Sequence, residues 1–171
     1  MPHSSGACSL CEKAISRHSL MDHLDRCLSE KGWKEVEDPS IVIHINPKMD
    51  NRYYLVLLVQ PDTTFYSLDA FLKTSVGVDE DRSSRFQFKD QFYFSHMNDG
   101  YPGMNFPLGL SPIMYEEFTY LLYTQGWFPV ILKGKMMGKI HRTPPNNKAI
   151  TIVTDNNTPE EYHQWLQRPR K

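Results

Sequence analysis

The sequence lacks several features that would place it in a broad functional class. Long apolar runs are absent: the longest, YYLVLLV at 53–59, has the length of a strand and falls far short of the roughly 18 residues of a membrane helix. Charge of one sign is not in excess, because the formal net charge is only −1, which disfavours binding to nucleic acid or membranes through bulk charge. What is present is a globular composition, with 40% hydrophobic and 23% charged residues.

Known catalytic motifs are also lacking. The sequence has no G-x-S-x-G, P-loop or G-x-G-x-x-G pattern. The best candidate for part of a catalytic site is His96 with Asp99 in the HMNDG loop, although a plain surface loop is the simpler interpretation. We therefore expect a protein that is not an enzyme. An enzyme whose site assembles in the region 96–127 is the alternative.

Cysteine is rare and confined to one segment. All three cysteines lie within residues 8–27, and an odd number does not indicate a disulfide framework. The first residues, MPHSSGACSL, show no basic start followed by a long apolar stretch, so they do not predict a secretory signal. Both observations favour a reducing compartment, the cytoplasm or, in a eukaryote, the nucleus.

The cysteine segment has the ligand spacing of a structural zinc site. Cys8, Cys11, His23 and Cys27 form the pattern C-x2-C-x11-H-x3-C. Two thiolates separated by two residues can point inward from a tight turn, and a His and a Cys four apart lie on one face of a helix. Four N or S ligands complete a tetrahedral zinc site. The alternatives are free cysteines beside a chance histidine, and a redox C-x2-C pair, for which the usual preceding strand is missing.

The second ligand pair lies in a predicted helix over about 20–30. Ser19 can cap this helix with Asp22 three residues later, and Gly32 is a suitable stop. His18 is a rival to His23 as the third ligand, but it precedes the expected cap. The helix therefore favours His23.

This segment, which ends in HLDRCL, resembles the Rad18-type ubiquitin-binding zinc finger of eukaryotic DNA-repair ligases, nucleases and proteases. The resemblance covers about 25 residues and implies zinc ligation by the four residues above. It also implies that the helix aspartate, Asp25, contacts a ubiquitin-like partner, with Asp22 and Leu24 as neighbouring candidates. A solvated helix charge is the simpler interpretation of Asp25. Short H-L-x-x-C fingers also occur in prokaryotic proteins whose partners are unknown.

The remaining sequence predicts α+β structure. KEVEDPS at 34–40 has the composition of a linker, which divides the chain into a CCHC zinc finger at 1–33 and an α+β domain at 41–171. Helices are expected from Thr64 and from Thr158. Strands are expected at 41–46, 52–61, 85–95 as a hairpin, 117–136 as two strands, and 148–153. The expected fold class is α+β, with a small N-terminal CCHC zinc finger followed by a mainly antiparallel sheet and two or three helices.

Residues 41–155 resemble, divergently, a prokaryotic family of plasmid open-reading-frame and transposon-passenger proteins, the MM3350-like family. The matching stretches are YYLVLLVQPDTTFYSLDAFLK, RFQFKDQFYF, MNFPLGL at 104–110 and FTYLLYTQGW at 118–127. The chain departs from the family at its Tyr-Asp-Phe-Gly strand, whose acidic residue is absent here. The resemblance implies an α+β fold and no particular activity.

One basic stretch supports a second binding hypothesis. Residues 132–142 carry Lys133, Lys135, Lys139 and Arg142, which could contact nucleic-acid phosphates. The exposed positions of the predicted 20–30 helix are mostly acidic and oppose such binding. The sequence therefore favours a non-catalytic zinc-finger adaptor or interaction protein with a protein partner, for which a ubiquitin-like protein is the candidate. A nucleic-acid-binding protein is the alternative.

Overall fold

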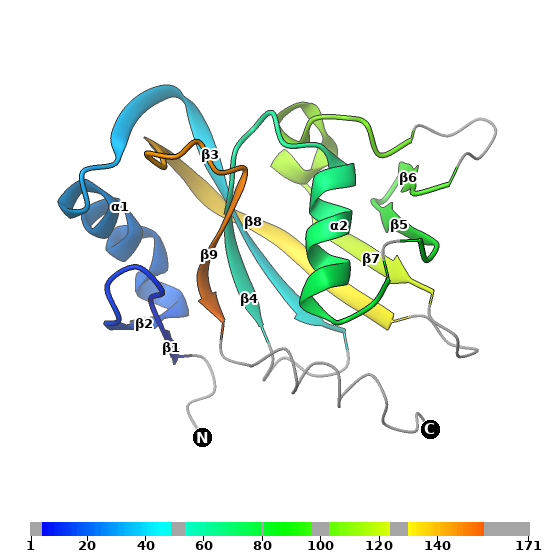
Figure 1. Ribbon diagram of the computed structural model, residues 1–171, viewed down its shortest axis with the longest axis horizontal. Helices are drawn as coiled ribbons and strands as arrows, with labels where there is room; N and C mark the ends of the chain where they lie inside the picture. Colours follow the sequence, from blue (N-terminus) through cyan, green and yellow to red (C-terminus); the bar gives the residue numbers. More distant parts are fainter. Residues whose placement is uncertain (1–4, 49–53, 80, 97–102, 124–129, 156–171) are drawn as a thin grey trace.

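A seven-stranded antiparallel sheet forms the centre of the molecule (Figure 1). The computed structural model describes residues 5–48, 54–79, 81–96, 103–123 and 130–155. Strand order in the sheet is β6-β5-β7-β8-β3-β4-β9, and each neighbouring pair is antiparallel. The hairpin of β1 and β2 is separate from this sheet.

The described elements are nine strands, two α-helices and three short 3-10 turns. The strands are β1 (Ser5–Ala7), β2 (Ala14–Ser16), β3 (Lys34–Pro47), β4 (Leu55–Val59), β5 (Ser84–Gln87), β6 (Phe92–Phe94), β7 (Phe118–Leu122), β8 (Val130–Thr143) and β9 (Ile150–Asp155). The helices are α1 (Leu20–Glu30) and α2 (Phe65–Ser75), with 3-10 turns at Arg17–Ser19, Leu108–Leu110 and Pro112–Met114. The expected hairpin at 85–95 is β5 and β6, and the expected helix from Thr158 lies outside the described residues.

The expected fold class is wrong in its arrangement. Within the described residues the chain is a seven-stranded antiparallel sheet with two α-helices and a separate β1–β2 hairpin. The cysteine-bearing segment is packed on this sheet and is not a separate small finger that precedes it. The leucines of α1 share one buried cluster with Val42 of β3 and Val56 of β4. The N-terminal segment therefore covers one face of the sheet. Independent folding of 1–33 and 41–171 stays a prediction.

The expected linker at 34–40 is the start of a strand. β3 begins at Lys34 and pairs with β8, but irregularly: Glu35 lies opposite Arg142 and Ser40 opposite Ile140. Residues 36–39 therefore oppose a single residue of β8. A bulge of this kind bends its strand and takes residues out of the ladder. Polar and proline residues are tolerated at such a place, which is why the segment has the composition of a linker.

Alternating side chains of β3 and β4 point into two cores, one on each face of the sheet. Ile41 and Ile43 of β3 pack with the residues of α2, whereas Val42 packs with those of α1. Figure 1 shows α1 and α2 on either side of these strands. Because both faces are covered, β4 is buried along its whole length, Leu55–Val59, and its sequence is apolar without alternation.

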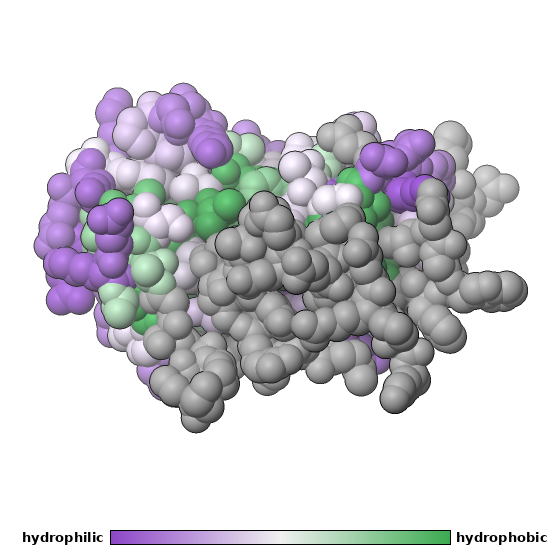
Figure 2. All heavy atoms as spheres, turned by 60° about the horizontal axis from the view of Figure 1, so that its bottom comes forward, coloured by the Kyte–Doolittle hydropathy of each residue, from purple (hydrophilic) through white to green (hydrophobic). Residues whose placement is uncertain are grey.

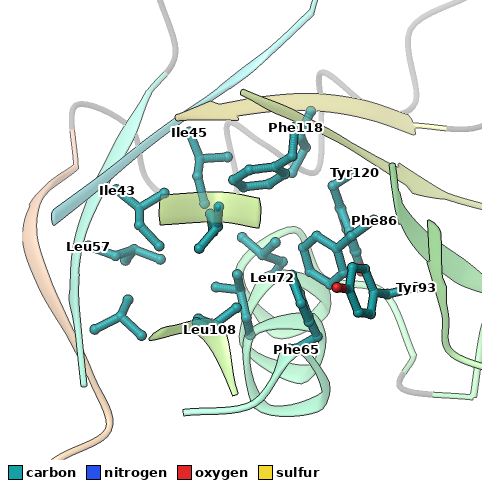
Figure 3. Packing of buried hydrophobic residues seen from close by; sticks show 14 of the residues in the cluster. Ile43, Ile45, Leu57, Phe65, Leu72, Phe86, Tyr93, Leu108, Phe118 and Tyr120 are labelled. Carbon is teal, nitrogen blue, oxygen red and sulfur yellow. The ribbon is translucent and has the colours of Figure 1, made fainter. Parts of the chain in front are cut away.

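The larger core lies between α2 and the sheet and is rich in aromatic rings (Figure 3). Thr64 caps α2 by accepting from the Ser67 N–H, which confirms the expected start of this helix. The ring of Phe65 then lies 4.3 Å from that of Tyr93 and 4.9 Å from that of Phe86, measured between centroids. These contacts join α2 to β5 and β6.

Two glycines of β8 allow close approach from opposite sides. A Cβ at Gly134 would lie 2.2 Å from Cζ of Phe118, whose ring covers the glycine from the cross-strand position. A Cβ at Gly138 would lie 2.5 Å from Cε of Met21, which reaches down from α1. Gly138 thus allows α1 to sit close against β8.

Candidate metal centre and the adjoining groove

Cys8 and Cys11 lie in the tight turn that joins β1 to β2. The hairpin pairs Ala7 with Ala14, and beyond this pair the Cys8 N–H donates to the Lys13 carbonyl at 2.8 Å. The Glu12 N–H donates back to the Cys8 carbonyl, also at 2.8 Å, and Glu12 has a φ of 66°. This left-handed residue closes the turn, so that both cysteine side chains belong to one compact knuckle.

His23 and Cys27 lie on the buried side of α1, one turn apart. The helix is preceded by a 3-10 turn whose cap is Ser16, which exchanges hydrogen bonds with Ser19 as a capping box. The expected cap of α1 by the Ser19 side chain is therefore wrong, because that hydroxyl faces Ser16.

The C-terminal end of α1 is as expected. The Gly32 N–H donates to the Ser29 carbonyl and the Trp33 N–H to the Leu28 carbonyl, with Gly32 at a φ of 76°. This is the pattern of a Schellman motif, in which glycine takes the left-handed position after the helix.

The four expected ligand residues come together. The sulfur atoms of Cys8, Cys11 and Cys27 and a ring nitrogen of His23 all lie within 4.8 Å of one another. Cys11 Sγ is 3.5 Å from His23 Nε2. In a tetrahedral site with metal–sulfur bonds of about 2.3 Å, ligand atoms are about 3.8 Å apart, so only a small contraction is needed. These residues are close enough to hold a metal ion.

Electrostatics in the cluster favour a bound cation. Burial, followed by the neighbouring sulfurs, raises the pKa of the Cys27 thiol to about 12. The backbone N–H of Lys13 lowers the pKa of Cys11, against the opposing effect of burial. Burial, and then the charges of Arg26 and Lys13, lower the pKa of His23, which favours the neutral imidazole that can bind a metal. If all three cysteines lose their protons, the three thiolates require a positive charge among them, which a metal ion would supply.

His18, the rival ligand, is exposed in the 3-10 turn before α1 and is not part of the cluster. The cluster is instead fastened to the sheet. The Ser9 N–H, inside the knuckle, donates to the Val153 carbonyl of β9 at 2.7 Å. The cluster therefore lies where the hairpin, α1 and the edge strand β9 meet.

An open groove of about 740 Å³ lies between α1, the bulge of β3 and the end of β8. Its lining residues are Met21, Asp22, Asp25, Glu35, Val36, Glu37, Lys139, Ile140, His141 and Arg142. The groove thus joins two surfaces that the sequence placed in separate hypotheses, the acidic helix and part of the basic stretch. Figure 2 shows hydrophilic side chains at this end of the molecule, on the left in both views.

Two residues of β8 hold the walls of the groove in place. Arg142 donates from Nη1 to the Trp33 carbonyl at 2.9 Å and approaches Glu35 Oε1 at 3.5 Å. The His141 ring nitrogen Nδ1 lies 3.3 Å from the Val36 carbonyl and 3.1 Å from that of Glu37. His141 therefore occupies the inside of the bulge and supports its backbone.

Other predicted residues lie elsewhere. Leu24 is fully buried against the sheet, so its side chain is not at the surface where a partner would bind. Lys133 and Lys135 are exposed on β8 but do not line the groove. His96 is exposed and shares hydrogen bonds with Ser83 and Ser95 through Nδ1. Its expected neighbour Asp99 lies outside the described residues, as do the rest of 97–102 and residues 124–127 of the alternative enzyme region.

Sequence reasoning missed a buried charged network in the larger core. Asp69 and Lys73 of α2 form an ion pair of 2.9 Å, with side chains 5% and 1% exposed. Ser84 Oγ and Tyr120 OH both donate to Asp69 Oδ1 at 2.5 Å, and Lys73 donates to the Arg82 carbonyl. Burial, and then the Asp69 charge, raise the pKa of Tyr120, so its hydroxyl stays protonated. The available signal was the (i, i+4) spacing of Asp69 and Lys73.

Comparison with known proteins identifies a shared fold. No protein-family model matches the sequence, and no curated protein matches it. A similar solved structure is that of the protein of unknown function MM3350 from Methanosarcina mazei Go1. It has a TM-score of 0.58 and 11% identity, over 78% of this chain and 83% of that chain. At this identity the likeness concerns the fold alone, and it agrees with the expected resemblance to the MM3350-like family. The resemblance to the Rad18-type finger stays a prediction.

The described helices are too short or too polar to cross a membrane.

Proposed function

We propose that this protein is a zinc-stabilised, non-catalytic interaction protein whose helix α1 presents acidic side chains to a protein partner. The observation that supports it most directly is the position of four N and S ligand atoms within 4.8 Å of one another. A metal held by four protein ligands has no open position for water or substrate. Such a metal stabilises the fold and does not activate a nucleophile.

The donor set favours zinc among the divalent metals. Three thiolates and one imidazole are soft and borderline ligands, and a tetrahedron of three sulfurs and one nitrogen is typical of structural zinc. Bound zinc would fasten α1 and the β1–β2 knuckle to each other and, through Ser9, to β9. The metal would thus hold α1 in a fixed orientation on the sheet.

The partner-binding role is assigned to Asp25 and Asp22. Both are exposed on α1 and both line the groove. Asp25 follows His23 and Leu24 in the order found in ubiquitin-binding fingers, which supports a ubiquitin-like partner. Leu24 is left out of the proposed surface because it packs in the core.

A nuclear magnetic resonance titration tests the partner. Zinc-loaded, ¹⁵N-labelled full-length protein is titrated with ubiquitin or with the nearest ubiquitin-like protein of the host. We expect shifts confined to α1 around Asp25, and their loss in Asp25→Ala with zinc still bound. Glu30→Ala is the matched control, since Glu30 is an exposed acid on the same helix that does not line the groove. A folded, zinc-bound protein that shows no shifts would rule out a ubiquitin-like partner.

A further inference from the structure

The groove beside α1 has an excess of unpaired negative charge. Among the described residues, three carboxylates that line the groove take part in no ion pair: Asp22, Asp25 and Glu37. Of the cationic side chains that line it, only Lys139 is likewise outside any ion pair in the described part of the chain. Arg142 is already occupied by Glu35 and the Trp33 carbonyl. Three free carboxylates therefore stand against one free ammonium group.

These carboxylates come from two walls that face the same space. Asp22 and Asp25 are on α1, and Glu37 is on the bulge of β3. Acidic side chains on a lone surface helix would simply be solvated. Here the bulge of β3 adds a further negative charge opposite those of α1, and the combined charges raise the local concentration of a cationic ligand.

The walls are held before any ligand arrives. Met21 packs over Gly138 and brings α1 into contact with β8. His141 supports the bulge from inside, and Arg142 joins the end of the α1 segment to β8 through the Trp33 carbonyl. A preformed groove loses little conformational entropy on binding, which favours recognition of an extended segment.

We propose that this groove binds an extended segment of a partner protein that carries lysine or arginine side chains. Its volume of about 740 Å³ is enough for a few residues of such a segment. The cationic side chains would reach Asp25 and Glu37 from between the walls, while their alkyl stems lie against Met21, Val36 and Ile140. A nucleic acid fits this lining poorly, since its phosphates would meet the free carboxylates.

This inference rests on the proposed function only in taking the partner to be a protein. It adds the chemistry of the bound segment and assigns Glu37, on β3, as a binding residue. The partner could lack a ubiquitin-like fold and still present a basic segment, or the reverse. The two hypotheses are therefore tested with different ligands, a basic peptide and ubiquitin.

The test measures binding of a fluorescent peptide of alternating lysine and glycine to the zinc-loaded full chain, by fluorescence anisotropy. A peptide with glutamate in place of lysine is the ligand control. We expect binding of the lysine peptide alone, weakening as salt is raised. Glu37→Gln and Asp25→Asn should each weaken it about two- to fivefold, the range for an exposed ion pair. Glu30→Gln, with the same charge change outside the groove, should leave it unchanged.

Three outcomes would overturn the inference. Equal weakening by Glu30→Gln would mean that the peptide senses net charge rather than the groove. Failure of the lysine peptide to bind, while ubiquitin still shifts α1, would leave the proposed function in place and remove the basic segment. Binding of a single-stranded oligonucleotide, strengthened in Glu37→Gln, would assign the groove to nucleic acid. Binding of the peptide without ubiquitin would instead keep the groove and remove only the ubiquitin-like partner.

Discussion

Cys11 and His23 are separated by eleven residues in sequence, yet the Cys11 sulfur lies 3.5 Å from Nε2 of His23. The contact joins the β1–β2 knuckle to α1 through two of the four candidate ligand atoms. The leucines of α1 pack against the sheet, whereas the knuckle meets α1 at the four candidate ligands. A metal here would act on the position of α1, and through α1 on the groove.

Removal of one ligand should release the metal and destabilise the fold. We expect about one zinc per chain in the purified protein and almost none in Cys27→Ser, because three ligands leave an open and weakened site. A loss of about 3 kcal/mol would lower Tm by about 6–12 °C in a chain of this size. Metal content and thermal unfolding, measured together, check both effects. His18→Ala is the control and should change neither; equal zinc content in Cys27→Ser would contradict the ligand assignment.

Zinc binding should release protons and weaken in acid. The pKa of Cys27, raised to about 12, means that its thiol is protonated at neutral pH and must lose that proton to bind zinc. Affinity should therefore fall as pH decreases, by about tenfold per pH unit for each proton released. Because the pKa of His23 is lowered, protons compete with zinc for its ring nitrogen only at lower pH. Calorimetry in buffers of different ionisation enthalpy counts the protons; an affinity that does not change between about pH 8 and 6 would contradict this.

The two glycines of β8 should differ in their response to alanine. In Gly134→Ala the new methyl group meets the ring of Phe118, which is buried and cannot move aside, so we expect a loss of about 1–3 kcal/mol. In Gly138→Ala it meets only the far end of Met21, a flexible side chain that can change rotamer. The second loss should be smaller than the first. Urea unfolding of both variants measures the two losses of stability. A larger loss in Gly138→Ala than in Gly134→Ala would mean that Met21 cannot move aside.

Breaking the buried network should cost more than removing it. Asp69→Asn removes the carboxylate of this buried ion pair, for which a loss of about 3–5 kcal/mol is expected. The double variant Asp69→Asn with Lys73→Met removes both charges, while the amide oxygen can still accept from Ser84 and Tyr120, and it should be the more stable of the two. Urea unfolding provides the comparison, with the exposed Asp62→Asn as control. If the single variant is as stable as the double variant, the ion pair between Asp69 and Lys73 does not stabilise the charge of Lys73.

Local features could be predicted from the sequence because they depend on near neighbours. The meeting of the four Cys and His side chains follows from spacing within 20 residues, the end of α1 from a glycine that takes a left-handed φ, and the start of α2 from a threonine cap. The bulge of β3 escaped prediction, because a polar segment with a proline has the same composition in a linker and in a bulge. Only pairing with β8, about a hundred residues away in sequence, distinguishes the two.

By itself, the sequence determined the grouping of the four Cys and His side chains and the buried faces of α1 and α2, since spacing and periodicity act over a few residues. Tertiary structure alone decided that α1 lies on the sheet rather than in a separate finger, and that Asp25 and Glu37 line the same groove. It also brought Tyr120 to Asp69 in the core. Each of these contacts joins elements that are far apart in the chain or that no local pattern connects, such as α1 and the bulge of β3. They arise from burial of both faces of β3 and β4, a condition that no local pattern contains.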